Sequence, residues 1–306
     1  MSMSQPALSG IFAAAISPCS PDGSPDPASL PDYLSFLANR GCHGALISGT
    51  TGEGPSFSAK ERLAFWEMAS SWRKQRPDFR LLAGTGTPSI NETMELNLAA
   101  FQLGFDAVVV LPPFFFRNAS EDGLFDWFAE LFESSVPEGR FLLGYHIPAV
   151  SGVSLPLSLL KKLSVAYPSK FGGLKDSSGS LDSAAAYIAG LAGSAVFVGN
   201  DRLLSSGLTA GAAGCITALA NLHSPELRAI YDGFHRGEDV NALQGAIDSL
   251  RAAMDDMPSP PAYIKALLYA EHNIKRWSVR LPLKDFTPIQ TARAREQIRA
   301  LDSKRS

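Results

Sequence analysis

The 306-residue chain is poor in cysteine: its three cysteines, Cys19, Cys42 and Cys215, are far apart and form no C-x-x-C pair. An odd number of isolated cysteines disfavours a disulfide framework and a zinc site and is typical of a reducing compartment. No apolar run approaches the ~20 residues of a membrane helix. Residues 1–10 have neither the basic nor the apolar region of a signal peptide. We therefore expect a soluble, cytoplasmic protein with no membrane partner.

The chain also lacks a surplus of positive charge. It has 27 Lys and Arg against 30 Asp and Glu, for a formal net charge of −3. This balance disfavours a nucleic-acid or anionic-membrane partner. The five histidines are scattered without metal-ligand spacing, so we expect no metal and no cofactor. A composition with 45% hydrophobic and 19% charged residues is that of a globular protein with a large core.

Short apolar segments recur along the chain, separated by helix-like stretches. The apolar segments cover residues 11–17, 44–49, 80–86, 106–113, 140–148, 171–178, 195–201 and 212–219. Each is continuous rather than alternating, which is typical of strands buried on both faces of a parallel sheet. Strand and helix alternating in this way predict βα units with right-handed crossovers.

Two of the helix-like stretches begin with the pattern of a capping box. In one, Ser58 precedes Glu61 by three residues, and in the other Ser89 precedes Glu92. A serine cap with an acidic residue at this spacing predicts that a helix starts just after the serine. The two serines therefore predict where the helices before and after the apolar segment 80–86 begin.

Eight βα units that close on themselves predict an α/β fold, the (β/α)8 TIM barrel. We assign residues 1–235 to the barrel and residues 236–306, which look purely helical, to a small C-terminal appendage. The alternative is an open doubly wound sheet, which ordinarily shows a glycine-rich turn after its first strand. Here residues 17–27 read SPCSPDGSPDP, with prolines where that turn would need glycines.

Active sites of such barrels form at the carboxyl ends of the strands. Several predicted strands of this chain end in polar or glycine-rich residues, although they are distant from one another in sequence. These residues are Gly49, Thr50, Thr51, Gly52, Glu53, Tyr145, Lys175, Asp201, Ile216 and Thr217. The barrel would bring them into one ring at one end.

Lys175 is the most informative of them, because it follows a short apolar run in the stretch FGGLKDSSGS. Lysine is almost never fully buried unless it is paired. An amine inside an apolar barrel is biased toward its uncharged, nucleophilic form and can attack a keto carbon to give a Schiff base. The alternative is a lysine whose amine reaches solvent from the end of the strand.

Four motifs in order, GTTGEG (49–54), YHIPAVSG (145–152), GGLKDSSG (172–179) and GAAGCITAL (211–219), resemble the dihydrodipicolinate synthase and N-acetylneuraminate lyase family. The resemblance extends from about residue 8 to the C-terminal helices. Any one motif would be weak, but four at the ends of predicted strands are a strong signal. Members of this family are class I aldolases, which form a Schiff base with pyruvate.

The resemblance implies catalytic roles for three residues. Lys175 would be the Schiff-base nucleophile, Tyr145 the general acid/base and Thr50 its proton relay. The turn that contains Thr50 would hold the pyruvate carboxylate. The substrate-binding set would be Gly49, Thr51, Gly199, Asp201, Arg202 and Ile216. From the residues alone, Tyr145 could instead be satisfied locally, and the two threonines could simply cap a turn.

Several positions depart from the family pattern. Phe115 stands where many members have a relay tyrosine, often supplied by a neighbouring subunit, and His146 replaces a common asparagine. Val150 replaces the arginine that binds the second carboxylate in dihydrodipicolinate synthases, and valine cannot pair with a carboxylate. Asp201 and Arg202 replace the Asp-Glu pair of sialic acid lyases. They could also be a helix N-cap and a solvent-facing residue.

The sequence therefore predicts a lyase that reversibly joins pyruvate to an aldehyde or cleaves a 2-keto acid. Two related activities stay open: dihydrodipicolinate synthesis and dehydration of a 2-keto-3-deoxy sugar acid. A third alternative is a non-catalytic regulator that binds keto acids. The resemblance also implies a homo-oligomer, a dimer or a tetramer.

Overall fold

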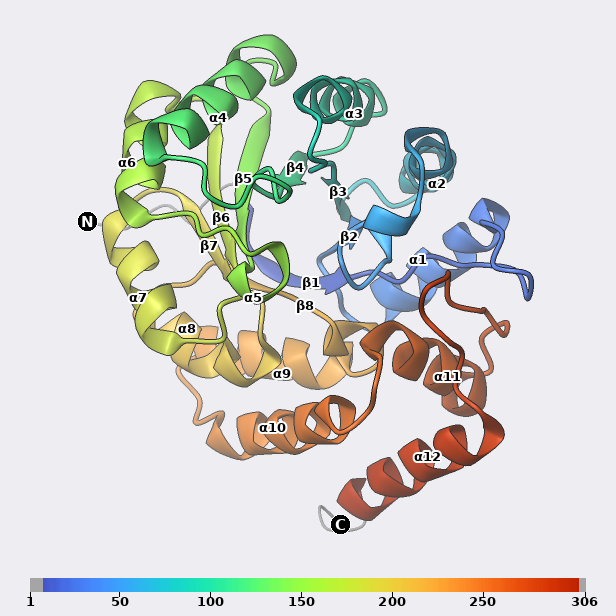
Figure 1. The fold of residues 1–306 in the computed structure, drawn as a ribbon. Helices are drawn as coiled ribbons and strands as arrows, with labels where there is room; N and C mark the ends of the chain where they lie inside the picture. The colour runs from blue at the N-terminus through green and yellow to red at the C-terminus, as the bar shows by residue number, and fades with distance from the viewer. Residues whose placement is uncertain (1–7, 303–306) are drawn as a thin grey trace.

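Eight parallel strands form the centre of the molecule (Figure 1). The computed structural model describes residues 8–302. Most of residues 1–10, where we expected no signal peptide, therefore lies outside the described residues. The strands are β1 Gly10–Ala14, β2 Gly44–Ile47, β3 Arg80–Gly84, β4 Ala107–Val110, β5 Phe141–His146, β6 Phe171–Asp176, β7 Ala195–Val198 and β8 Gly214–Thr217. They pair in chain order, and β8 closes onto β1. The predicted TIM barrel is confirmed.

A helix follows each strand and packs on the outside of the barrel. These helices are α1 Leu30–Asn39, α2 Ala59–Arg73, α3 Ile90–Gln102, α4 Glu121–Ser135, α6 Leu157–Ala166, α7 Leu181–Gly190, α8 Leu204–Ala210 and α9 Ser224–His235. Shorter helical turns interrupt the loops: η1 Pro27–Ser29, η2 Gly54–Ser56, α5 Pro148–Ser151, η3 Asp201–Leu203 and η4 Leu219–Asn221. Several of these turns follow the carboxyl ends of strands, where they shape the candidate site.

The hydrophobic core has two parts because side chains alternate across each strand. One part fills the space between the barrel and its helices and contains Leu142 and Leu174. The other fills the barrel interior. Its larger members are Phe12, Leu46, Leu82, Val109, Leu143, Tyr145, Phe197 and Ile216. The interior is therefore packed, and a polar group inside it lies in an apolar environment.

The capping prediction is right for one helix and half right for the other. Ser58 and Glu61 form both hydrogen bonds of the capping box at the start of α2. At α3, the Ser89 side chain accepts from the backbone N–H of Glu92. The reciprocal part is wrong, because the backbone N–H of Ser89 donates to Oγ1 of Thr87 at 3.2 Å.

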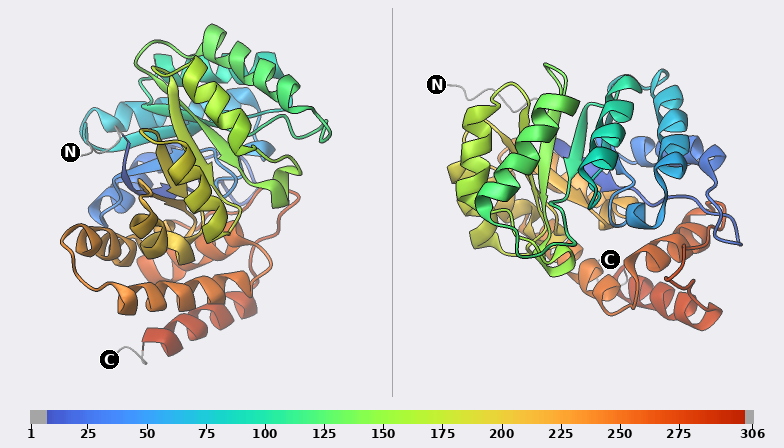
Figure 2. Two further views of the ribbon diagram at one scale, coloured as in Figure 1. Left: turned by 90° about the vertical axis from the view of Figure 1, so that its left-hand side faces the viewer. Right: turned by 45° about the horizontal axis from the view of Figure 1, so that its top comes forward.

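Three further helices follow the barrel: α10 Asn241–Asp255, α11 Pro260–His272 and α12 Pro288–Asp302. They lie together at one side of the barrel, outside its ring of helices (Figure 2). They match the helical segments expected after residue 235, whereas the domain boundary itself stays a prediction. None of the helices within residues 8–302 has both the length and the apolar character needed to cross a membrane.

The α2 capping box provides a test of the fold. We expect Ser58→Ala to lower the free energy of unfolding by about 1 kcal/mol, because the N–H groups of the first turn lose a partner. Denaturant unfolding would measure the change. The matched control is Ser249→Ala, which removes an exposed hydroxyl from the interior of α10. An equal loss in the two variants would contradict the assigned role of the cap.

Candidate active site

Lys175 and Tyr145 lie side by side inside the barrel. They occupy matching register positions on the neighbouring strands β6 and β5. The Nζ atom of Lys175 is 4.1 Å from the centroid of the Tyr145 ring, and Lys175 is only 3% exposed. A lysine whose amine reached solvent would be much more exposed, so the structure contradicts that alternative for Lys175.

Tyr145 also contacts Thr50, which comes from the loop after β2. The two hydroxyl oxygens are 3.4 Å apart. Burial raises the pKa of Tyr145, but the charge of Lys175 and hydrogen bonds from Thr50, Lys175 and Ser177 outweigh burial, so its pKa is lowered. A phenol with a lowered pKa gives up its proton more readily near neutral pH.

The loop that carries Thr50 and Thr51 has a specific backbone shape. Ser48 and Glu53, on either side of the two threonines, have φ angles of 59° and 57°, in the left-handed region that few side chains adopt. A Cβ atom at Gly54 would lie 1.9 Å from the carbonyl oxygen of Ser48. Glycine is therefore required at position 54, and the GTTGEG sequence folds into a tight turn against the end of β2.

The remaining predicted positions line the same end of the barrel. Ile216 on β8 is fully buried in the interior cluster that contains Tyr145. A Cβ atom at Gly199, just after β7, would lie 1.9 Å from Oγ of Ser177. Glycine at this position thus leaves room for Ser177, whose hydroxyl interacts with Tyr145. Gly49 is buried at the start of the threonine loop.

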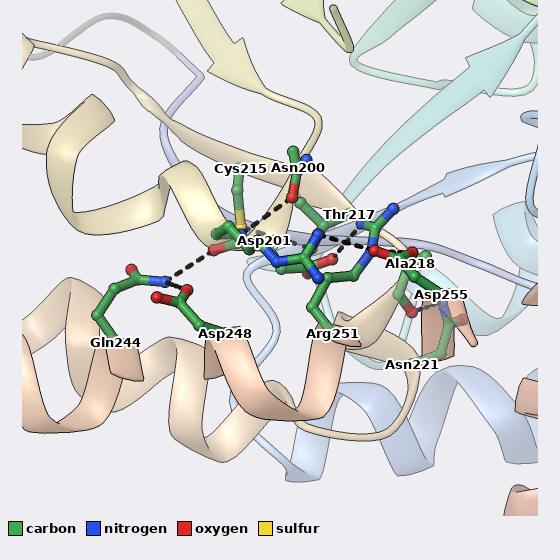
Figure 3. Close-up of polar contacts among 11 residues, drawn as sticks. Asn200, Asp201, Cys215, Thr217, Ala218, Asn221, Gln244, Asp248, Arg251 and Asp255 are labelled. Atoms are coloured by element: carbon green, nitrogen blue, oxygen red, sulfur yellow. Dashed lines mark hydrogen bonds and ion pairs between the residues drawn. The ribbon is translucent and has the colours of Figure 1, made fainter. Parts of the chain in front are cut away.

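Asp201 contacts α10, the first of the C-terminal helices (Figure 3). Its Oδ2 atom pairs with Arg251 of α10 at 2.9 Å, and its backbone oxygen accepts from Gln244 at 3.1 Å. Its Oδ1 atom is buried without a hydrogen-bond partner among the described residues. The alternative in which Asp201 caps the helix is wrong, because Asn200 supplies the cap of η3.

Arg202 also pairs with α10. Its guanidinium lies 2.8 Å from Asp255, and its side chain is partly exposed. Arg251 bonds to the same Asp255 side chain at 2.8 Å. Asp201 and Arg202 thus belong to one charged network with this helix. No hydrogen bond or ion pair of residues 8–302 that the structure defines joins either side chain to Lys175 or Tyr145.

Two residues near the site are absent from the sequence-based set. One is Ser177, whose hydroxyl interacts with Tyr145. It follows Lys175 by two residues, and because residues two apart on a strand face the same side, this spacing could have predicted its place in the site. Arg62 of α2 is buried and lines a small cavity together with Thr50 and Tyr145. Its guanidinium has long contacts to the carbonyl oxygens of Phe57 and Gly84, at 3.3 and 3.5 Å, and burial lowers its pKa. The sequence gives no signal for it.

The residues that depart from the family pattern are found in different environments. Phe115 and the adjacent Phe116 are 75% and 72% exposed, and their rings pack edge to face. Val150, on α5, is 60% exposed. His146 is buried, and its Nδ1 atom accepts from the backbone N–H of Leu155 at 3.1 Å. Burial lowers the pKa of His146, which disfavours the charged form of its ring.

A metal site in a protein requires a group of acidic, histidine or cysteine side chains. Within the part of the chain that the structure describes, no three or more His, Cys, Asp or Glu side chains are grouped so that they could hold a metal ion. Residues 8–302 thus offer no candidate metal centre.

Comparison with known proteins decides the family. Residues 7–301 match the model of the dihydrodipicolinate synthetase family. The chain belongs to this family. A DapA-like lyase of Chloroflexus aurantiacus is 37% identical over 94% of both chains. An N-acetylneuraminate lyase of an Enterobacter species is 29% identical over 92% of both.

Solved structures of the dihydrodipicolinate synthetase family have the same fold. The dihydrodipicolinate synthase of Agrobacterium tumefaciens has a TM-score of 0.85 at 29% identity and covers 96% of this chain and 99% of its own. Members of the family are Schiff-base lyases, so the lyase class predicted from the sequence is confirmed. The roles of individual residues stay predictions.

The contact between Thr50 and Tyr145 can be tested by titration. We expect Thr50→Val to raise the pKa of Tyr145, because a hydrogen bond to the phenolate oxygen favours the ionised form and its loss disfavours it. The NMR signal of ¹³C-labelled tyrosine would follow the titration, with Tyr145→Phe assigning the resonance. Thr209→Val, on exposed α8, is the control. An unchanged pKa in Thr50→Val would contradict the contact.

Proposed function

We propose that this protein is a class I carbon–carbon lyase that reversibly cleaves a 2-keto acid into pyruvate and an aldehyde. The observation that carries the proposal is the position of the Lys175 amine, which is buried and lies 4.1 Å from the centre of the Tyr145 ring. An amine in an apolar interior is a nucleophile for carbonyl carbon. The family, whose members are Schiff-base lyases, supports the same reaction type.

In the proposed mechanism, the neutral amine of Lys175 attacks the keto carbon, and loss of water gives an iminium ion. The iminium accepts the electron pair of the adjacent carbon–carbon bond when that bond breaks, so that an aldehyde leaves and an enamine remains. Protonation of the enamine carbon and hydrolysis release pyruvate and restore the amine. The reverse sequence joins pyruvate to the aldehyde.

Tyr145 would transfer protons during these steps. Its hydroxyl lies between the lysine side of the site and Thr50, whose hydroxyl is 3.4 Å away. Such a pair can first give a proton to the carbinolamine oxygen, which leaves as water. After the iminium has formed, it can take a proton from the substrate hydroxyl next to the carbon–carbon bond that breaks, and then pass that proton to the enamine carbon. The lowered pKa of Tyr145 supports this role. Thr50 would relay the proton.

The pyruvate carboxylate would bind at the threonine loop. We assign it to the hydroxyl and backbone N–H of Thr51 and the neighbouring backbone, since clustered N–H groups of a tight turn bind anions. Gly49, Ile216 and Gly199 would form the walls of the pocket. Their small or apolar side chains keep the site narrow around a three-carbon acid.

The second substrate is less constrained. Val150 is apolar and exposed, which disfavours dihydrodipicolinate synthesis with its second carboxylate. Asp201 and Arg202 could bind the distal part of the substrate only if their ion pairs with α10 opened. Because these charges are already neutralised, we favour an uncharged aldehyde as the second substrate. Dehydration of a 2-keto-3-deoxy sugar acid uses the same lysine and remains an alternative, as does a non-catalytic regulator.

We further propose a homo-oligomer in the cytoplasm. Phe115 and Phe116, in the loop between β4 and α4, form an exposed apolar surface, and such surfaces often mark interfaces. A second copy covering this surface would form a dimer or, with a further interface, a tetramer. The three cysteines are buried free thiols, which fits a reducing compartment.

Trapping with borohydride tests the nucleophile. We expect pyruvate and borohydride to add one stable adduct per chain at Lys175, because reduction fixes the imine. Peptide mass spectrometry would locate the adduct. Lys175→Ala should form none, whereas Lys170→Ala, which alters a lysine just before β6, should trap normally. Full trapping in Lys175→Ala would disprove the proposal.

Turnover separates the three activities. Incubation with a panel of 2-keto acids should release pyruvate if the protein is a lyase, lose water with all carbons retained if it is a dehydratase, and give neither with a regulator. We expect pyruvate, with kcat in Tyr145→Phe reduced about 10²–10⁴-fold as acid–base catalysis requires. Full activity in Tyr145→Phe would remove Tyr145 from the mechanism.

A further inference from the structure

The threonine loop is joined to the C-terminal helices by a buried ion pair. Glu53, in the loop, and Lys265, on α11, lie 212 residues apart in sequence, and their Oε1 and Nζ atoms are 2.6 Å apart. The exposed fractions of these side chains are 1% and 2%. Charged residues are almost never buried this deeply unless they are paired. Removing one partner therefore leaves an uncompensated charge in the interior.

Both ends of this ion pair have further partners. The second carboxylate oxygen of Glu53 accepts from the backbone N–H of Arg280 at 2.6 Å. Nζ of Lys265 also donates to the carbonyl oxygen of Ser278 at 2.7 Å. The segment between α11 and α12 thus bonds to both charges, which fixes Glu53 in one position.

Arg280 adds a second connection between this segment and the start of α2. Its guanidinium pairs with Glu61 at 2.6 Å and lies 4.9 Å from the centre of the Phe57 ring. Glu61 is the acidic residue of the capping box at Ser58. The C-terminal segment therefore contacts the threonine loop and the helix that follows it.

The position of Glu53 is transmitted to Thr50 through the backbone. The N–H of Glu53 donates to the carbonyl oxygen of Thr50 at 3.0 Å, and that of Gly54 donates to Gly49 at 3.0 Å. Glu53 itself has a left-handed backbone, with φ of 57°. Such a conformation is unfavourable for glutamate and persists only when its surroundings impose it. The ion pair with Lys265 supplies that constraint.

We propose that Glu53 and Lys265 are positioning residues that hold the Thr50–Thr51 turn in its catalytic geometry, so that α11 is part of the catalytic apparatus. The inference rests on the proposed function, because it assigns the turn a role in proton relay and carboxylate binding. A misplacement of about 1 Å far from the reacting atoms can reduce a rate about 10²-fold. The pair therefore controls turnover without touching the substrate.

The test uses pyruvate alone, since the second substrate is unknown. The iminium of pyruvate forms an enamine reversibly, so the enzyme should exchange the methyl protons of pyruvate for deuterium in D₂O, which NMR can follow. We expect Lys265→Met to lower kcat/KM for exchange about 10²-fold and to shift its pH profile to more alkaline pH. Borohydride should still trap pyruvate at Lys175, because β6 is unchanged.

Three further variants complete the test. Lys265→Arg keeps the charge and should recover part of the exchange rate. Glu53→Gln with Lys265→Met leaves no unpaired charge at this site, so it should fold even if Lys265→Met alone does not, and it should still exchange slowly. Glu271→Gln, which breaks the ion pair of α11 with Arg295 away from the loop, is the matched control and should exchange within about twofold of the wild type.

The outcomes separate the two proposals. A wild-type protein that traps no pyruvate would refute the proposed function. A wild type that traps and exchanges pyruvate, together with a folded Lys265→Met or double variant that exchanges at the wild-type rate and with the wild-type pH profile, would overturn the role of the ion pair.

Discussion

The chemistry of this protein depends on one contact, a lysine amine held against a tyrosine ring inside a closed barrel. The contact follows from the register of β5 and β6, which places Tyr145 and Lys175 opposite each other. Closure of the barrel removes bulk water from around the amine, and the alternation of side chains directs it inward. The other groups act on this pair: Thr50 and Ser177 bond to the phenol, while Phe197 stands beside the lysine on β7.

Much of this arrangement could be predicted from the sequence. All eight strands were located, because strands buried on both faces are continuous apolar runs that local composition reveals. The rule that a barrel brings the ends of its strands together placed Lys175, Tyr145 and Thr50 in one ring, and their contacts in the structure agree with that ring. Their catalytic roles came from the resemblance to the family and not from local pattern or topology.

Other contacts could not be predicted, since they join segments that no local pattern links. Asp201 and Arg202 look like substrate ligands from their place after β7, yet their charges pair with Arg251 and Asp255 of α10. Glu53 looks like part of a polar turn, and nothing in its surroundings points to a lysine on α11. In both cases a charge at a strand end is neutralised by a helix that follows the barrel. The helical segment was recognised, but its interactions were not.

The dependence of the threonine turn on α11 has a consequence for how the protein is made. Synthesis runs from the N-terminus, so the last strand is complete at Thr217, well before Lys265 is added to the chain. The ion pair between Glu53 and Lys265 closes a long loop of chain, and its formation opposes the entropic cost of that closure. The pair can form only after Lys265 has been synthesised. A nascent chain could therefore assemble its barrel, lysine included, while Glu53 still has no counter-charge. Competence for catalysis would arrive at the last stage of maturation, after the barrel itself has formed.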